Sequence, residues 1–141
     1  MIRRKAFALA ELLCLMLAAA VLQAQDRLRA GIWENTVTSN GQSATRSHCI
    51  SALETEQSNG AESSIRASIE KALAKGGKCQ LKEFKIEGNT KTELLVCGSV
   101  TYFNQTTFHN GDTFETTTTR TESGIAKVTL IKGPRTGPCP S

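Results

Sequence analysis

The sequence predicts a mainly β, α+β domain, in which an antiparallel, curved multi-stranded sheet or partial barrel carries one amphipathic helix and is stapled by two disulfides. Three observations predict it. From residue 78 onward, Thr, Val, Ile, Phe and Tyr accumulate with a period of two between turn-forming residues. Residues 61–75 repeat their apolar positions with a helical period. Four of the five cysteines lie beyond an apolar leader.

Residues 1–24 have the layout of a cleavable signal peptide. Three basic residues precede an apolar stretch from Leu12 to Leu22, and cleavage after Ala20 or Ala24 fits the preference for small residues. The stretch is shorter than the roughly 20 residues that span a bilayer, which argues against a retained anchor. Cys14 lies inside the apolar stretch, which argues against a lipoprotein. We therefore expect export to the periplasm and no membrane span after cleavage.

Residues 25–141 form one β-rich domain in this interpretation. Three of the 17 basic and one of the 13 acidic residues lie in the leader, so 14 and 12 remain. Nucleic-acid binders concentrate Lys and Arg on one face. Here lysines and glutamates alternate between Lys82 and Glu93, as on a solvated surface. We therefore expect no nucleic-acid partner.

Cysteine usage favours disulfides over a metal site. An even number of cysteines remains in the domain, and these are Cys49, Cys79, Cys97 and Cys139. In an oxidising compartment such a set favours two disulfides, which help a small domain with a single core. No pair has the C-x-x-C spacing of zinc sites, and His48 and His109 lie in separate segments. We expect no metal and no cofactor.

The mature chain opens with a predicted hairpin. Residues 31–38 alternate apolar and polar side chains, Asn40-Gly41 is a hairpin turn signal, and residues 44–49 form the partner strand. Trp33 is the only tryptophan and lies early in the first strand. We expect it to pack in the core or to close one end of a curved sheet, with ligand stacking as the alternative.

Two helices follow in the prediction. Ser51 and Glu54 match a capping box, and the turn-forming run at residues 58–60 ends that short helix. The longer segment, Ala61 to Lys75, ends at Gly76-Gly77, which suits a left-handed termination. Its apolar stripe has the spacing i, i+4, i+7 and i+8 and consists of Ile65, Ile69, Ala72 and Leu73. This is the amphipathic helix, and its stripe should face the sheet.

The next strand requires an irregularity. Leu81, Phe84 and Ile86 share one face only if the alternation slips by one residue near Lys82-Glu83. A β-bulge produces such a slip. We therefore predict a bulge there.

The rest of the chain indicates a meander, joined by turns at residues 88–90, 110–112 and 122–124. The predicted strands are residues 91–103, 105–109, 113–121 and 125–131. The tail from Gly133 to Pro140 holds the three prolines of the chain, and we expect no regular structure there.

Strand register selects the disulfide pairing. Counting outward from the turn at residues 88–90 places Cys97 within one or two residues of the position opposite Cys79. Cross-strand neighbours have Cβ atoms about 4.5–5.5 Å apart, close to what a disulfide needs. Cys79 should therefore pair with Cys97 and, by elimination, Cys49 with Cys139. The second bond would fix the tail.

Together these features resemble the bacterial exported family called domain of unknown function 3617 (DUF3617). The resemblance rests on Gly31-Ile32-Trp33-Glu34, the spaced cysteines, the Gly-Asn hairpin, the Thr-rich meander and the terminal Gly137-Pro138-Cys139-Pro140. It covers the chain from about Ala30 to Pro140. It implies an exported, β-rich protein, and it brings no activity and no functional residues.

No catalytic residue is predicted. His48 precedes a cysteine that we expect to be oxidised, and His109 lies at a turn. Glu83 and Glu93 could face each other across a hairpin, but flanking lysines indicate a solvated outer face. No phosphate loop, metal-binding run or nucleotide fingerprint occurs. We therefore do not expect an enzyme.

We accordingly expect a non-enzymatic binding or accessory protein, monomeric, for an apolar small ligand or an envelope protein. Trp33, Tyr102 and Phe103 are the aromatic residues that could contact a ligand, although sheet packing explains them as well. The alternative is an inhibitor or docking partner of an envelope hydrolase, with the turn at residues 110–112 or the helix as the contact. A hydrolase would require His48 or His109 beside a carboxylate and a hydroxyl.

Overall fold

The computed structural model describes residues 26–140 of the 141-residue chain. The predicted signal peptide, residues 1–24, lies outside the described residues.

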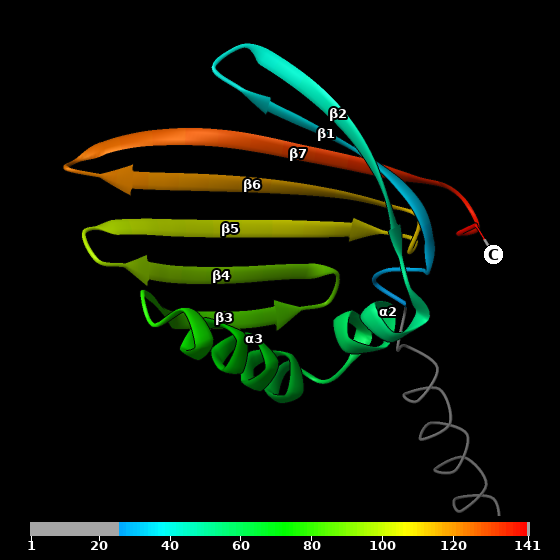
Figure 1. The fold of residues 1–141 in the computed structure, drawn as a ribbon, viewed down its shortest axis with the longest axis horizontal. Coiled ribbons are helices and arrows are strands. Elements are labelled where there is room, and N and C mark those ends of the chain that lie inside the picture. The colour runs from blue at the N-terminus through cyan, green and yellow to red at the C-terminus, as the bar shows by residue number, and fades with distance from the viewer. Residues whose placement is uncertain (1–25, 141) are drawn as a thin grey trace, which may run out of the picture.

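Seven antiparallel strands form one open, curved sheet in the order β2-β1-β7-β6-β5-β4-β3 (Figure 1). The elements are β1 (Gly31–Ser39), β2 (Gln42–Ile50), α2 (Ala52–Asn59), α3 (Glu62–Gly76), β3 (Cys79–Glu87), β4 (Thr90–Cys97), β5 (Val100–His109), β6 (Thr113–Glu122) and β7 (Ile125–Gly137). Helix α3 lies along β3, at one edge of the sheet, and α2, which follows β2 in the chain, lies beside α3. The predicted class, a mainly β antiparallel sheet with helix and two disulfides, is confirmed.

Local sequence signals account for the first hairpin and both helices. Asn40 and Gly41 have positive φ angles of 51° and 75°, as a two-residue hairpin turn requires. The capping box at the start of α2 is present, and Gly77 ends α3 in the left-handed conformation with φ 65°. These predictions are confirmed.

The predicted bulge in β3 is also confirmed. The register of β3 against β4 shifts between Leu81 and Glu83. Leu81 and Phe84 are consequently both buried, with 9% and 6% of their surfaces exposed. The bulge keeps the apolar residues of β3 on one face despite their irregular spacing.

The predicted strand 91–103 is wrong. The chain turns at Gly98-Ser99, so that β4 ends at Cys97 and β5 runs from Val100 to His109 without the break expected after residue 103. Gly98 has φ 63°, which glycine adopts without steric cost. One glycine and one serine thus suffice for a hairpin turn inside a run that otherwise resembles a continuous strand.

The unstructured tail is a second wrong prediction. Strand β7 continues through Pro134 to Gly137. The ladder between β1 and β7 is interrupted between the Trp33–Arg135 and Thr36–Lys132 pairs. Pro134 falls in this interruption, where its missing N–H breaks no ladder hydrogen bond.

Both predicted disulfides are confirmed. Cys79 and Cys97 are directly opposite each other in the β3–β4 ladder, 18 residues apart in sequence. Cys49 and Cys139 are joined across 90 residues, with their Cα atoms 5.5 Å apart. The second bond attaches the tail after β7 to β2, which is not adjacent to β7 in the sheet.

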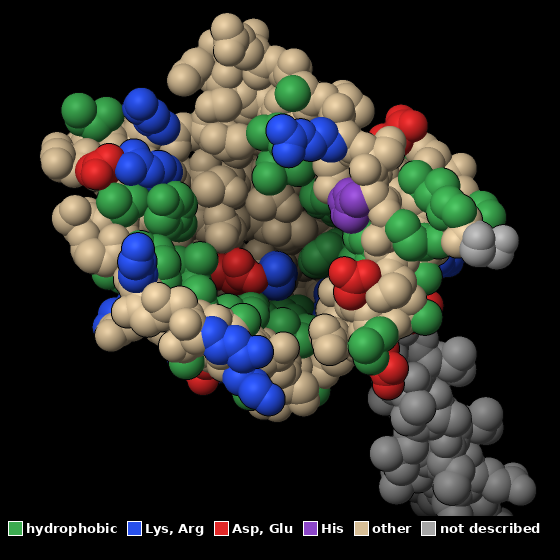
Figure 2. Space-filling model, in the orientation of Figure 1, with side chains coloured by type: hydrophobic (Ala, Val, Ile, Leu, Met, Phe, Trp, Pro, Cys, Tyr) green, Lys and Arg blue, Asp and Glu red, His purple; other side chains and the backbone are tan. Residues whose placement is uncertain are grey.

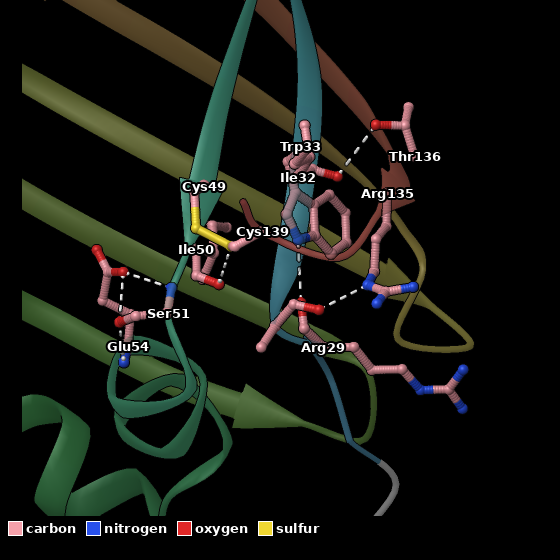
Figure 3. Close-up of a disulfide and its surroundings, with 11 residues drawn as sticks. Arg29, Ile32, Trp33, Cys49, Ile50, Ser51, Glu54, Arg135, Thr136 and Cys139 are labelled. Atoms are coloured by element: carbon pink, nitrogen blue, oxygen red, sulfur yellow. Dashed lines mark hydrogen bonds between the residues drawn. A yellow bond between two sulfur atoms is a disulfide. The ribbon is translucent and has the colours of Figure 1, made fainter. Parts of the chain in front are cut away.

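A small apolar cluster closes one end of the sheet. Trp33 is completely buried and contacts Leu28 and Phe108, with Phe114 and Ile50 at its margin. Its indole nitrogen donates a hydrogen bond to the carbonyl oxygen of Arg29 at 3.0 Å (Figure 3). The expected structural role of Trp33 agrees with this position.

We predict that Trp33→Ala destabilises the protein by about 3–5 kcal/mol, because it leaves a cavity in the cluster. Urea unfolding followed by far-UV circular dichroism would measure this, since the variant lacks the only tryptophan. Phe103→Ala is the control and should cost less than about 1 kcal/mol, because 41% of Phe103 is exposed. Similar losses for both variants would contradict the assignment of the core.

The two disulfides should differ in their contribution to stability. In the chain-entropy model, loops of 90 and 18 residues correspond to about 5 and about 3 kcal/mol. Replacing Cys49 and Cys139 by Ser should therefore lower the unfolding midpoint more than replacing Cys79 and Cys97. Chemical denaturation of the two double variants tests the order, and the reverse order would refute this explanation.

Candidate binding site

A hollow of about 390 Å³ lies between the helices and the sheet (Figure 2). This volume falls within the range of small-molecule sites. Its apolar walls come from the N-terminal segment, β2, α3 and β5, and consist of Leu28, Ile50, Ile65, Ile69 and Phe108. We call the sheet face that points toward this hollow the helix face, and the opposite one the outer face.

Helix α3 supplies one wall because its stripe is incompletely covered. Ile65 and Ile69 were expected to pack on the sheet, yet α3 has no fully buried residue. Both side chains are half-buried and line the hollow. The stripe therefore leaves apolar surface facing a space rather than a sealed core.

An ion pair forms the floor of this hollow. Lys91 Nζ lies 2.6 Å from Glu93 Oε1, and the two side chains are 27% and 12% exposed. Asn104 donates a further hydrogen bond to Glu93 Oε2 at 3.3 Å. The charges thus neutralise each other where solvent access is limited.

The prediction that Glu83 and Glu93 both lie on a solvated outer face is wrong for Glu93. Counted outward from the Gly88-Asn89 turn, Glu83 is opposite Leu94 and Glu93 is opposite the buried Phe84. Glu83 and Glu93 therefore lie on opposite faces of the sheet. The position of Glu93 on the helix face follows from the register set by the Gly88-Asn89 turn, because Glu93 shares the face of Phe84.

His48 and Glu54 lie at the mouth of the hollow. Hydrogen bonds from the Ser51 backbone N–H and hydroxyl lower the pKa of Glu54, and His48 adds a smaller effect of the same sign. Both donors are 2.7 Å from Glu54 Oε2 (Figure 3). The carboxylate is thus engaged as the cap of α2.

A second, more open hollow adjoins the first along β4 and β5. It measures about 780 Å³ and is lined by the Cys79–Cys97 disulfide, Lys78, Leu95, Gly98, Tyr102, Asn104 and Thr118. Asn104 lines this second hollow and is hydrogen-bonded to Glu93, which lines the first. The two hollows therefore adjoin at the Glu93–Asn104 contact on the helix face.

The three aromatic candidates occupy different environments. Trp33 is completely buried, which leaves its ring no surface for a ligand. Tyr102 lines the second hollow, and hydrogen bonds to Tyr102 and then to Glu122 raise the pKa of Arg120. Phe103 is 41% exposed on the outer face, because adjacent strand residues point to opposite sides. Only Tyr102 is placed to contact a molecule in a hollow.

Most of the residues that line the site are not predicted as site residues from the sequence. The apolar stripe that contains Ile65 and Ile69 predicts packing against the sheet and does not indicate a hollow. The alternation of lysines and glutamates predicts a solvated surface for Lys91, but this side chain lies on the floor of the first hollow. The register set by the Gly88-Asn89 turn, which places Lys91 opposite Ile86, is the signal that puts this residue on the helix face.

His109 is the last residue of β5 and does not line the first hollow, although its neighbour Phe108 does. Within residues 26–140, no group of three or more His, Cys, Asp or Glu side chains is arranged to hold a metal ion. In the same range, no helix has the length and apolar character needed to cross a membrane.

Comparison with known proteins gives one match. Residues 28–139 match the family described as protein of unknown function (DUF3617). No curated protein and no solved structure matches the chain. The matched range includes every strand of the sheet in full, and both disulfides lie within it. The chain therefore belongs to the DUF3617 family, whose function is unknown.

Proposed function

We propose that this protein is an exported, non-enzymatic binding protein of the bacterial periplasm that holds an apolar small ligand in the first hollow. The observation that carries the proposal is the set of aliphatic and aromatic walls around a space of about 390 Å³. Apolar side chains left around a ligand-sized space provide a favourable site for an apolar molecule, because binding removes their surface from water.

The leader and the cysteines support export. Residues 1–24 combine basic residues, an apolar stretch and small residues before the cleavage positions. Two disulfides join all four cysteines of residues 25–141. Such bonds persist in oxidising compartments such as the periplasm.

The arrangement at the mouth supports a role without catalysis. A hydrolase built around His48 would need a carboxylate to orient the ring and a hydroxyl to act as nucleophile. The nearest candidates, Glu54 and Ser51, are hydrogen-bonded to each other and cap α2. Neither group makes a hydrogen bond to His48 within the described part of the chain.

We predict that Ile69→Asp weakens binding of the neutral fluorescent probe N-phenyl-1-naphthylamine by about tenfold or more, because a charge replaces apolar wall surface. Ile125→Asp is the matched control. Ile125 is 66% exposed and lines neither hollow, so its variant should bind as the parent does. Probe titration of the disulfide-bonded protein measures both affinities.

Unfolding midpoints of the two variants would show whether the loss reflects the site or the fold. The proposal fails if the parent protein does not bind the probe, or if both aspartates weaken binding equally.

Two adjoining apolar side chains on the outer face, Leu94 and Phe103, with Val128 two strands from Phe103, favour a second function, docking on an envelope protein such as a hydrolase. Leu94 is opposite Phe103, Phe103 is opposite Thr119, and Thr119 is opposite Val128. Phe103 and Val128 are 41% and 55% exposed. Exposed apolar side chains that adjoin one another mark interaction surfaces more often than isolated ones do.

The two functions predict opposite results for one pair of variants. If an envelope protein docks on the outer face, Phe103→Glu should abolish a crosslinked complex in periplasmic extracts, while Ile69→Asp should leave it intact. If the complex instead depends on Ile69, the outer face is not the contact.

A further inference from the structure

On the helix face, more cationic than anionic side chains have no ion-pair partner among the described residues and could therefore bind a charged ligand. Arg46 is two residues from His48 on β2 and therefore shares its face. Lys78 lines the second hollow, and Lys127 is opposite Arg120 on the helix face. Within the described residues, none of Arg46, Lys78 and Lys127 takes part in an ion pair; the six pairs involve other side chains.

The acidic groups on the same face are already engaged. Glu93 is paired with Lys91, and Glu122 is paired with Arg120. Glu54 at the mouth accepts two hydrogen bonds from Ser51. The charges of Glu93 and Glu122 are therefore offset by their cationic partners, whereas Glu54 keeps its charge. Against the three unpaired cations Arg46, Lys78 and Lys127, this leaves the summed charge of these groups on the helix face positive.

The ion pair between Lys91 and Glu93 and the unpaired cations lie in different places. The floor pair of the first hollow is mostly shielded from solvent, so an apolar chain lying on it would cover an ion pair that is already formed. Covering a formed pair costs less than burying a single charge. Arg46 is exposed two residues from His48, which lines the first hollow, and Lys78 is exposed and lines the second. An apolar chain in the first hollow would therefore end near cations that have no partner.

We propose that the ligand is a single-chain anionic amphiphile, whose acyl chain lies in the first hollow and whose carboxylate or phosphate head group binds at Arg46. This inference rests on the function proposed above and adds the chemical class of the ligand. A guanidinium donates paired hydrogen bonds to a carboxylate or a phosphate and keeps its charge at all relevant pH values. Arg46 is the one Lys or Arg in β2, and it lies on the same face as His48, two residues away, which lines the first hollow.

Three ligands with the same oleoyl chain test the charge of the head group: oleate, oleoyl lysophosphatidate and neutral monoolein. Each is titrated, below its critical micelle concentration, against the complex of N-phenyl-1-naphthylamine with the disulfide-bonded protein, and its displacement of the probe is measured. We expect the anionic ligands to bind about tenfold more tightly than monoolein, as a charge-assisted hydrogen bond implies. Raising the salt concentration should narrow the difference, because the cations are exposed.

Arg46→Gln should abolish most of this preference while leaving the affinity for monoolein unchanged. Arg66→Gln is the matched control, because Arg66 pairs with Glu70 on α3 and lines neither hollow. The stronger of the two anionic ligands identifies the head group as carboxylate or phosphate.

Equal binding of monoolein and both anionic ligands would overturn this inference and leave the proposed function standing. An unchanged preference in Arg46→Gln would overturn the assignment of the head-group site. Failure of the probe and of all three ligands to bind would refute the proposed function itself.

Discussion

The structure depends on the contacts that the segment of residues 26–30 makes at one end of the sheet. Its carbonyl oxygens accept hydrogen bonds from the Trp33 indole and the Arg135 guanidinium. Its backbone also bonds to Gly111 in the β5–β6 turn and, twice, to the Asn59 side chain at the end of α2. One short segment thus joins the first strand, the last strand, a distant turn and a helix.

That arrangement explains why a hollow remains on the helix face of the sheet. The Trp33 cluster closes one end, and α3 packs against β3 at one edge. The strands between them are held by their ladders and by cross-strand contacts such as the hydrogen bond between the Thr106 and Thr116 hydroxyls. Threonine favours extended structure but buries little apolar area. The helix face therefore stays partly open, with apolar residues around the gap and a polar floor.

Local chemistry in the sequence predicted most of the fold. Asn40-Gly41, Gly77 and the Ser51–Glu54 box each act within a few residues, so their outcome can be read from the chain. The turn at Gly98 is not evident from the sequence, because strand-forming residues surround this glycine. The continuation of β7 past Pro134 depends on a gap in the ladder between β7 and β1, which only the pairing of these two strands creates. The hollow could not be predicted, since it results from how far α3 lies from strands distant in sequence.

The position of β7 beside β1 sets the order in which the domain can form. Every other pairing in the sheet joins consecutive strands, whereas Trp33 is opposite Arg135. Cys49 precedes both cysteines of the other disulfide, and its own partner is the last of the four. If the cysteines oxidise as the chain emerges from its N-terminus, Cys49 encounters two non-native partners before Cys139 becomes available. A bond formed with either of them then has to be exchanged, which takes seconds to hours according to the isomerase present.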